Sequence, residues 1–543
     1  MNIENTMNKY FLFLFILITQ PLYSQPNPEW VMRYENSSGA SVKDMFVDKQ
    51  GNVYLAGAVI SSQKLLIIKY NTSGTEIWSR TLDSVINNDS RKMFIAADDS
   101  GQVYVLSPGI IHVQSIAMNR ECTRLVKYSS GGKLLWERKY INEDSLFTIC
   151  KGIVLDDSSN VYAAAETWQE GQSSNYTTLK YNSEGNFKWI RVYDSPSHIY
   201  DSPTFLSKDI ENNIYITGSN TSTITTVKYN SFGDSLWVLR DNPGFIGLKI
   251  IVDDSLNVFV GGNSSVAFNG TTFTLKKFNN ARNLIWQKSY NNPTVLRDNN
   301  NFSDFTIDKN SNSFITGVSG DTMELAWDYA SLRYNGSGDS IWTQKYSPVH
   351  NSDDRCASIA VDKLGNCIVT GKSNDNLFGY KYLTIVYAPA GQQRYLLTYN
   401  NNFPNGNHEA IKVLTDTSGN IYITGNSQTM GGVNGIATLK YGVLTGLQQT
   451  TNFIPDKFEL GQNYPNPFNP DTNIKFKISY NSKVKVTVFD ILGKEIETLV
   501  DKNFSPGEYK VQWNASERSS GIYFYCMFSD GLLISAKSMS FIK

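Results

Sequence analysis

One repeated pattern runs through most of this chain and constrains its possible folds more than any other feature. An Asp that opens a short turn recurs at intervals of 44 residues (Asp209 to Asp253) to 58 residues (Asp98 to Asp156). Repeats of this length, each holding several short strands, are typical of the four-stranded blades of a β-propeller. The full series is Asp48, Asp98, Asp156, Asp209, Asp253, Asp308, Asp362 and Asp416. The pattern therefore predicts an all-β propeller of eight blades.

Each Asp is predicted to hold a hairpin turn. Its side-chain oxygen can accept backbone N–H groups, and the residue three positions later must take a left-handed conformation that suits Gly. Gly stands there four times, at 51, 101, 365 and 419, and the other four repeats carry Ser159, Asn212, Leu256 and Ser311. Leu256 is the unfavourable member of this set. Because the turn itself needs an Asp, we interpret these carboxylates as structural, with calcium ligation as the alternative at Asp98-Asp99 and similar pairs.

The two ends of the repeat array complement each other. The last repeat stops at Lys440-Tyr441 without the strand that carries a Trp in earlier repeats, such as Trp78. The region before the first complete repeat supplies that missing strand around Trp30. We therefore predict that the strand around Trp30 pairs with residues 439–441 and closes a ring over residues 26–446, which hides sheet edges. Seven blades would result if the unit around Val386 were degenerate.

A different pattern begins near residue 458. A proline-rich stretch at 463–470 is followed by short alternating strands, predicted at 473–478, 484–489, 508–513, 521–527 and 535–542. Strands of this length separated by tight turns indicate a small antiparallel β-sandwich over 458–543, joined to the ring by a linker at 447–457. At the other end, residues 1–24 read as a secretory signal peptide, because Tyr10 to Ile18 is apolar but too short to span a bilayer. We expect no transmembrane anchor in the mature chain.

Little in the sequence indicates chemistry. Charge is balanced, with 49 basic and 50 acidic residues, which argues against a nucleic-acid partner. The five cysteines show no zinc or disulfide spacing and are interpreted as buried small side chains; Cys356 and Cys367 are expected on one hairpin but out of register. The four histidines, His112, His198, His350 and His408, form no motif and are interpreted as solvated bystanders. We therefore name no catalytic residue, metal ligand or cofactor, and the ligand-binding residues stay unknown.

The recurring Lys-Tyr pairs, such as Lys69-Tyr70, allow two interpretations. They could bind glycans or anions around the ring, but their position within strands favours pairing and packing between blades. For the whole chain, a surface binding or adhesion module with a glycan or protein ligand fits best. The alternative is a secreted hydrolase or lyase with its site at one mouth of the propeller, which clustering of His112, His198 or His350 with carboxylates would favour.

Two resemblances to known families accompany these patterns. The repeats from Trp30 to Tyr441 resemble SBBP β-propeller repeats, which implies an extracellular or surface protein and says little about the ligand. The C-terminal segment resembles the type A C-terminal sorting domain of type IX secretion substrates; the matching stretches are 463–470, 488–493, 506–509, 520–524 and 537–543. This resemblance implies a Gram-negative host and periplasmic transit. It also implies export by the type IX machinery, after which the domain is removed and the protein is attached to the surface or released.

Overall fold

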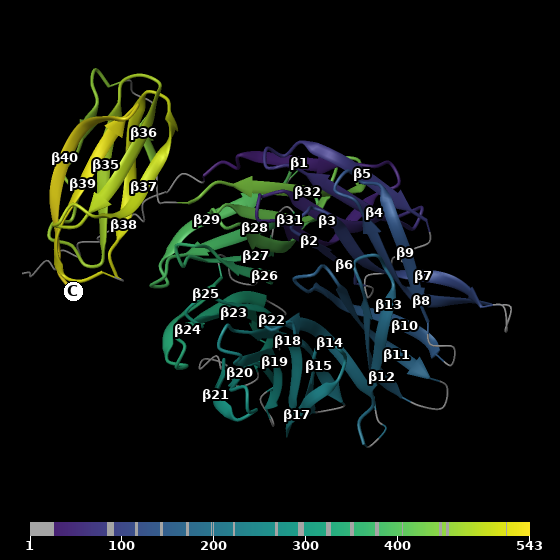
Figure 1. The fold of residues 1–543 in the computed structure, drawn as a ribbon. Helices are drawn as coiled ribbons and strands as arrows, with labels where there is room; N and C mark the ends of the chain where they lie inside the picture. The colour runs from purple at the N-terminus through teal and green to yellow at the C-terminus, as the bar shows by residue number, and fades with distance from the viewer. Residues whose placement is uncertain are drawn as a thin grey trace, which may run out of the picture. The chain divides into compact units, whose positions relative to one another are not determined.

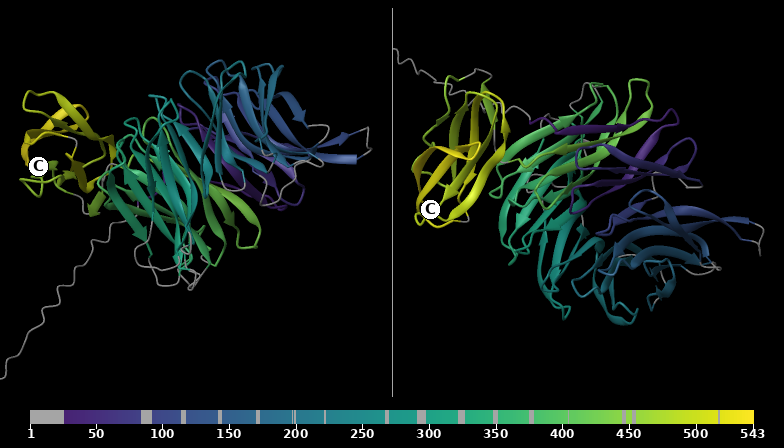
Figure 2. Two further views of the ribbon diagram at one scale, coloured as in Figure 1. Left: turned by 90° about the horizontal axis from the view of Figure 1, so that it is seen from below. Right: turned by 45° about the horizontal axis from the view of Figure 1, so that its top comes forward.

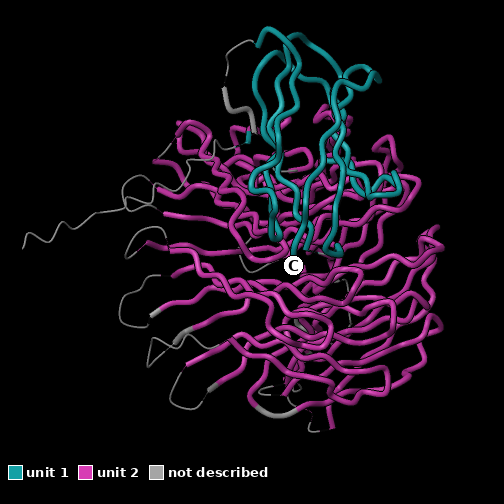
Figure 3. The backbone as a smooth tube through the Cα atoms, turned by 90° about the vertical axis from the view of Figure 1, so that its left-hand side faces the viewer, with its two compact units in different colours: residues 1–26, 445–543 teal, residues 27–444 magenta. Residues whose placement is uncertain are grey.

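The computed structural model describes residues 26–543 apart from several short segments. The segments left out are 84–91, 114–117, 142–144, 170–172, 197, 199, 221–222, 267–269, 291–297, 322–326, 348–351, 375–378, 404, 445–447, 452–454 and 517. The predicted signal peptide lies outside the described residues. Within them the fold is all-β, and no helix is long and apolar enough to cross a membrane. The chain divides into two compact units, one spanning Asn27–Leu444 and the other containing Thr445–Lys543 (Figure 3).

The first unit consists of four-stranded antiparallel repeats, each formed by consecutive strands (Figure 1). The first four repeats are β2 (Ala40–Val47), β3 (Val53–Val59), β4 (Lys64–Tyr70) and β5 (Glu76–Leu82); β6 (Phe94–Ala97), β7 (Val103–Val113), β8 (Met118–Tyr128) and β9 (Leu134–Tyr140); β10 (Ser145–Leu155), β11 (Val161–Gln169), β12 (Ser174–Tyr181) and β13 (Phe187–Tyr193); and β14 (Asp201–Lys208), β15 (Ile214–Asn220), β16 (Thr223–Tyr229) and β17 (Ser235–Pro243). The second and third strands of each repeat are buried almost throughout, because neighbouring repeats cover both of their faces.

The second half of this unit continues the same order. Its strands are β18 (Phe245–Val252), β19 (Val258–Val266), β20 (Gly270–Phe278) and β21 (Leu284–Ser289); β22 (Asp298–Ile307), β23 (Ser313–Asp321), β24 (Trp327–Tyr334) and β25 (Ser340–Tyr346); β26 (Arg355–Val361), β27 (Cys367–Asn374), β28 (Tyr380–Tyr387) and β29 (Gln393–Tyr399); and β30 (His408–Thr415), β31 (Ile421–Gln428) and β32 (Asn434–Tyr441). A short parallel pairing of β20 with β22 joins two of these repeats into one sheet. The repeat around Val386 has its four strands, β26 to β29.

The N-terminal strand completes the last sheet, as the sequence predicts. Strand β1 (Trp30–Tyr34) pairs antiparallel with β32, with Trp30 opposite Lys440, and Figure 1 shows the two strands side by side. Strand β2 of the first repeat in turn packs against β30, β31 and β32 of the last. The sheets therefore follow one another round a closed, propeller-like ring, which the two views of Figure 2 show from other directions.

Every described Asp turn has the predicted backbone conformation. The residue three positions after each Asp has a positive φ, from 58° at Ser159 to 90° at Gly419. Leu256 shares this conformation, with a φ of 62°. A left-handed backbone places the Cβ of a non-glycine residue too close to its own backbone, so Leu256 introduces strain where other repeats use Gly.

Replacing Leu256 with Gly should therefore stabilise the ring. We expect the free energy of unfolding to rise by about 1 kcal/mol, because relief of the left-handed strain outweighs the extra freedom of an unfolded Gly. Chemical denaturation of the purified protein measures this change. Ser255→Gly, one residue earlier and without a positive φ, is the matched control and should give no gain.

A repeated contact fastens most of the sheets to the next one. In the first repeat the Trp78 indole donates to the carbonyl oxygen of Ser130 at 2.9 Å, and the Lys69 ammonium donates to the same oxygen at 3.2 Å. Lys69 also lies 5.0 Å from the ring centroid of Tyr54. Three further Trp and Lys pairs share the carbonyl of Ser183, Ser231 or Gly336 in the same way, and Trp342 with Arg333 shares that of Pro389. In these repeats the Lys or Arg of the recurring pair thus contacts the next sheet, and in the first repeat Tyr70 packs on Trp30 of the preceding sheet.

The two ends of the strands differ. One end carries the Asp turns and the shorter turns between third and fourth strands, whose conformations recur around the ring. The opposite end carries the connections between second and third strands and between successive sheets, which vary in length and sequence. Function on a repeat scaffold usually depends on such variable loops. We call this the loop end of the ring.

The second unit has two four-stranded sheets around one core. The first holds β33 (Gln448–Thr451), β34 (Glu459–Leu460), β35 (Asp471–Ile478) and β38 (Gly507–Asn514), and the second holds β36 (Ser482–Phe489), β37 (Glu495–Phe504), β39 (Gly521–Ser529) and β40 (Leu532–Phe541). Alternate residues of β38 are buried, as expected for a strand with one face on a core. The predicted strands are present, whereas β37 was not predicted.

One predicted boundary needs correction. Residues 447–457 are predicted to be a linker, but Gln448–Thr451 forms β33 and pairs with β38. A strand in that register satisfies its backbone hydrogen bonds within the second unit. The described part of this segment therefore contributes a strand to the C-terminal fold.

Candidate functional site

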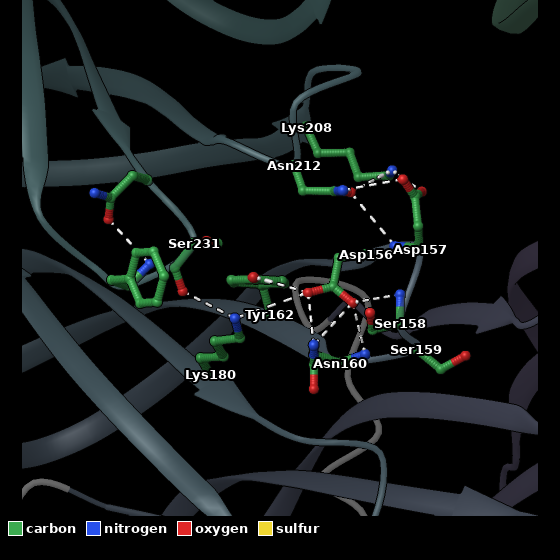
Figure 4. A network of polar contacts seen from close by, with 12 residues as sticks. Asp156, Asp157, Ser158, Ser159, Asn160, Tyr162, Lys180, Lys208, Asn212 and Ser231 are labelled. Carbon is green, nitrogen blue, oxygen red and sulfur yellow. Dashed lines mark hydrogen bonds and ion pairs between the residues drawn. The ribbon is translucent and has the colours of Figure 1, made fainter.

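The Asp turns are the first candidates for a ligand site because they bring carboxylates together with Lys and Tyr. In Figure 4, Asp156 accepts hydrogen bonds from the backbone N–H groups of Ser158 (3.0 Å) and Asn160 (2.9 Å). Its other oxygen accepts the Asn160 amide (2.8 Å) and the Tyr162 hydroxyl (3.0 Å), and the Lys180 ammonium lies 3.8 Å away. The carboxylate is thus used by its own turn, and its Asn and Tyr partners recur in other repeats.

This arrangement supports the structural interpretation of the Asp residues. A calcium ion needs six or more oxygen ligands that converge on one point. Asp48, Asp209 and Asp416 show the same inward pattern, with both oxygens accepting bonds from the turn and from a Tyr six residues later. Over the described residues, no group of three or more His, Cys, Asp or Glu is placed to hold a metal ion.

Replacing Asp156 with Ala should therefore destabilise the ring without affecting a ligand site. We expect the free energy of unfolding to fall by about 3 kcal/mol, more than the roughly 1 kcal/mol of one lost cap, because Tyr162 and two backbone N–H groups lose a charged acceptor. Denaturant unfolding with and without calcium tests this. Asp157→Ala is the control: Asp157 is exposed and contacts the Lys208 ammonium and the Asn212 amide. Its loss should change stability by less than about 0.5 kcal/mol. A calcium-dependent midpoint that Asp156→Ala abolishes would contradict the structural role.

The three histidines within the described residues have separate contacts. His112 contacts the Asn119 amide oxygen across the β7–β8 hairpin at 3.0 Å, and His198 lies 2.6 Å from the Asp194 carboxylate in the connection before β14. His350 lies outside the described residues. His408 is not a solvated bystander: it is fully buried, and its ring nitrogens contact the Ser427 hydroxyl and the Phe403 carbonyl. Burial lowers the pKa of His408, which fits a neutral side chain that fixes its loop.

The cysteines follow their interpretation with one exception. Cys122, Cys150, Cys356 and Cys367 are buried, whereas Cys526 is partly exposed. Cys356 lies opposite Gly371, four positions from Cys367, so the two are out of register for a disulfide.

Three aromatic side chains form a cluster at the loop end that the repeat does not explain. Phe147 at the start of β10 lies 5.3 Å from Trp168 near the end of β11, measured between ring centroids. Trp168 in turn meets Tyr200, which precedes β14, at 5.5 Å in an edge-to-face arrangement. Tyr200 is 41% exposed, and the other two rings are half-buried. The cluster therefore presents aromatic surface to solvent across two adjacent sheets.

A buried ion pair lies directly beneath these rings. The Lys151 ammonium is 2.6 Å from the Glu166 carboxylate, and Glu166 also accepts hydrogen bonds from the Ser202 hydroxyl (3.0 Å) and the Trp168 indole (3.1 Å). Burial alone would raise the pKa of Glu166, but attraction to Lys151 and these hydrogen bonds lower it below its usual value. Glu166 is therefore ionised at neutral pH. Its charge orients both Lys151 and Trp168.

Replacing Glu166 with Gln should destabilise the protein by about 3 kcal/mol at pH 7, because Lys151 is left without its counter-charge. A carboxyl whose pKa falls on folding contributes stability above its unfolded pKa of about 4.3 and loses it as pH falls through the folded value. The difference between the two proteins should therefore shrink below pH 4. Urea unfolding at both pH values measures it. Glu409→Gln, at a more exposed pair with Lys372, should cost less than about 1 kcal/mol, and equal losses in both variants would contradict the assignment.

The positions of the tryptophans in the sequence point to this cluster, although the repeat pattern does not. Seven tryptophans occupy the repeated position on the outermost strand of a sheet: Trp30, Trp78, Trp136, Trp189, Trp237, Trp286 and Trp342. Trp513 lies in the second unit. The remaining two, Trp168 and Trp327, lie outside the repeat. Both are at the loop end; Trp327 carries the Arg355 guanidinium 5.6 Å from its ring, and Arg355 is held by Asp353 at 2.8 Å. The two tryptophans outside the repeated position thus lie at the loop end, next to charged side chains.

Comparison with known families identifies the C-terminal segment. Residues 462–539 match the profile of the family described as a secretion system C-terminal sorting domain. The predicted sorting domain is confirmed. A domain of this kind implies secretion or export to the cell surface. Among curated proteins, none matches this chain.

Solved structures resemble the chain only weakly. An ulvan lyase bound to a saccharide is 10% identical, with 70% of this chain and 97% of the lyase covered at a TM-score of 0.42. The WD40 domain of SCAP from fission yeast is 10% identical, with 76% and 94% covered at a TM-score of 0.41. An α-L-arabinanase from Penicillium chrysogenum is 13% identical, with 56% and 94% covered at a TM-score of 0.32. Nothing about activity follows from similarities of this size.

Proposed function

We propose that this protein is exported by the type IX secretion system of a Gram-negative bacterium and acts outside the cell, or on its surface, as a binding or adhesion module. The match of residues 462–539 to the sorting-domain family carries the export part. In this proposal residues 1–24 are a signal peptide, residues 458–543 are a type A sorting domain with an Ig-like sandwich fold, and the type IX machinery is the partner that recognises it.

The binding part of the proposal rests on the ring at residues 26–446. We take it to be an eight-bladed propeller of SBBP-like repeats; the four strands around Val386 support eight blades over seven. Bonds within the turns account for the recurring Asp residues, and contacts between sheets account for most of the recurring Lys and Trp residues. The features left for function are those at the loop end, where aromatic and charged side chains from adjacent sheets meet.

A fusion experiment tests export without disturbing the ring. A folded reporter with a signal peptide, followed by residues 445–543, should appear on the surface or in the medium of a host with a working type IX system. The same fusion should stay in the periplasm of a host that lacks the system. Surface delivery in both hosts, or in neither, would contradict the assignment.

A hydrolase or lyase is the second candidate, and the His198–Asp194 pair is the observation in its favour. A His next to a carboxylate can act as a general base, and this pair lies in the connection that also carries Tyr200. Turnover of a polysaccharide that His198→Ala abolishes would favour the enzyme over the binding module.

A further inference from the structure

The contacts of Glu166 differ from those of the equivalent residue in two other repeats in a way that suggests a use beyond folding. Asn263 and Asn426 occupy the same place, five residues after the start of the second strand of their repeats. Their amide oxygens accept backbone N–H groups from the following sheet, those of Phe302 at 2.7 Å and Val42 at 3.0 Å. Glu166 instead binds three side chains, those of Lys151, Ser202 and Trp168. Because Ser202 lies in β14 of the following sheet, Glu166 also joins two sheets, but it does so with a charged group that positions side chains.

The aromatic cluster above it does not serve the core. Phe147, Trp168 and Tyr200 belong to none of the hydrophobic clusters formed by the described residues, whereas Trp78 and Trp189 are members of such clusters. Rings that remain partly exposed and are held in place by a polar network have surface free for a ligand. Trp168 is fixed from both sides, by Phe147 and Tyr200, and at its indole N–H by Glu166.

The chemistry of this surface matches that of a sugar ring. Sugars present C–H faces that pack on aromatic rings, and hydroxyl groups that need both donors and acceptors at fixed positions. Here the rings supply the apolar faces, Lys151 and Ser202, which are partly exposed, can donate, and the Ser202 hydroxyl can also accept. Glu166 is 1% exposed and holds these groups in place without facing the ligand. Burial together with the nearby charge of Glu166 raises the pKa of Tyr200, whose hydroxyl also interacts with Glu166 and Ser202.

We propose that Phe147, Trp168 and Tyr200, with Lys151, Glu166 and Ser202 beneath them, form a saccharide-binding site at the loop end of the ring. This inference rests on the proposed binding function and specifies its ligand class. A peptide rich in proline could also pack on aromatic rings, but it offers few hydroxyl groups to the partly exposed Lys151 ammonium and Ser202 hydroxyl beside them. The polar network favours the saccharide.

Affinity electrophoresis of the mature full-length protein against a panel of soluble polysaccharides tests the site. The panel should contain starch, xylan, mixed-linkage β-glucan, pectin, alginate and chondroitin sulfate. We expect at least one of them to retard the protein. Tyr200→Ala and Trp168→Ala should each weaken that binding at least tenfold while leaving the melting temperature within a few degrees.

Phe232→Ala is the matched control. Phe232 is 77% exposed in the turn between β16 and β17, at the opposite end of the strands, and its loss should leave binding unchanged. No retardation of the wild-type protein by any polysaccharide would overturn the proposal, as would equal binding by the wild-type, Tyr200→Ala and Trp168→Ala proteins. Binding of a proline-rich peptide in place of the polysaccharides, lost in the same variants, would overturn the saccharide assignment. The fusion experiment on export is unaffected by any of these results, so the two proposals fail separately.

Discussion

Removal of residues 26–36 from the mature chain should abolish cooperative folding of the ring. Strand β1 supplies the fourth strand of the last sheet, and Trp30 makes the contact with the first repeat that other tryptophans make elsewhere. The Trp30 indole donates to the Thr72 carbonyl at 3.1 Å, and Lys440 donates to the same oxygen at 3.3 Å. Deletion therefore breaks the pairing with β32 and the closing contact together.

The expected loss of stability is large because the deletion removes a whole strand together with the buried Trp30 side chain. Truncating one buried Trp to Ala costs about 3–5 kcal/mol, and that is a large fraction of the stability of a typical domain. The deletion also exposes the unpaired edge of β32, which promotes association between chains. Differential scanning calorimetry should show the main transition of the full-length protein replaced by a broad, low-temperature change, with aggregates in size-exclusion chromatography.

Trp30→Ala provides the graded comparison. This variant keeps β1 in register and loses only the closing contact, so it should retain a cooperative transition at a lower temperature. A deletion protein that melts at the same temperature as the full-length chain would show that the ring does not depend on β1.

The sequence predicts the ring well because its determinants are local and repeated. The turn at Asp156 depends on residues within six positions, so spacing alone indicates both the turn and the left-handed residue after it. The match between the first and last repeats likewise predicts the pairing of Trp30 with the end of the array. Repetition makes each prediction a test of the others.

Features that depend on a single residue or on two separate loops could not be predicted in this way. His408 looks like an isolated loop histidine, and only the packing of Phe403 and Ser427 around it makes it buried. Trp168 in β11 and Tyr200 in the connection before β14 lie 32 positions apart, and no periodicity brings them together. Strand β37 carries charged residues at its exposed end, such as Asp501 and Lys502, which obscures the alternation that marks its neighbours.

The last prediction concerns the boundary between the ring and the C-terminal unit. A chain that keeps residues 1–24, the proposed signal peptide, but ends at Leu444 should fold as a closed ring and accumulate in the periplasm. The reason is structural: β1 and β32 complete the last sheet without any strand from beyond Tyr441. The cut belongs at Leu444, because a chain ending at residue 457 would keep β33, whose partner β38 is absent.

Cell fractionation and protease shaving measure the outcome. We expect the truncated protein to be protected from external protease in intact cells, to be released by osmotic shock, and to melt within a few degrees of the main transition of the full-length protein. Leu492→Ala, an exposed change within the sorting domain, is the control. It should leave the domain folded, so this full-length variant should be exported like the unchanged protein. If the chain ending at Leu444 is cleaved by external protease as readily as the full-length protein, residues 445–543 do not direct export. If it is retained but unfolded, the ring needs the second unit, and the closure by β1 is insufficient.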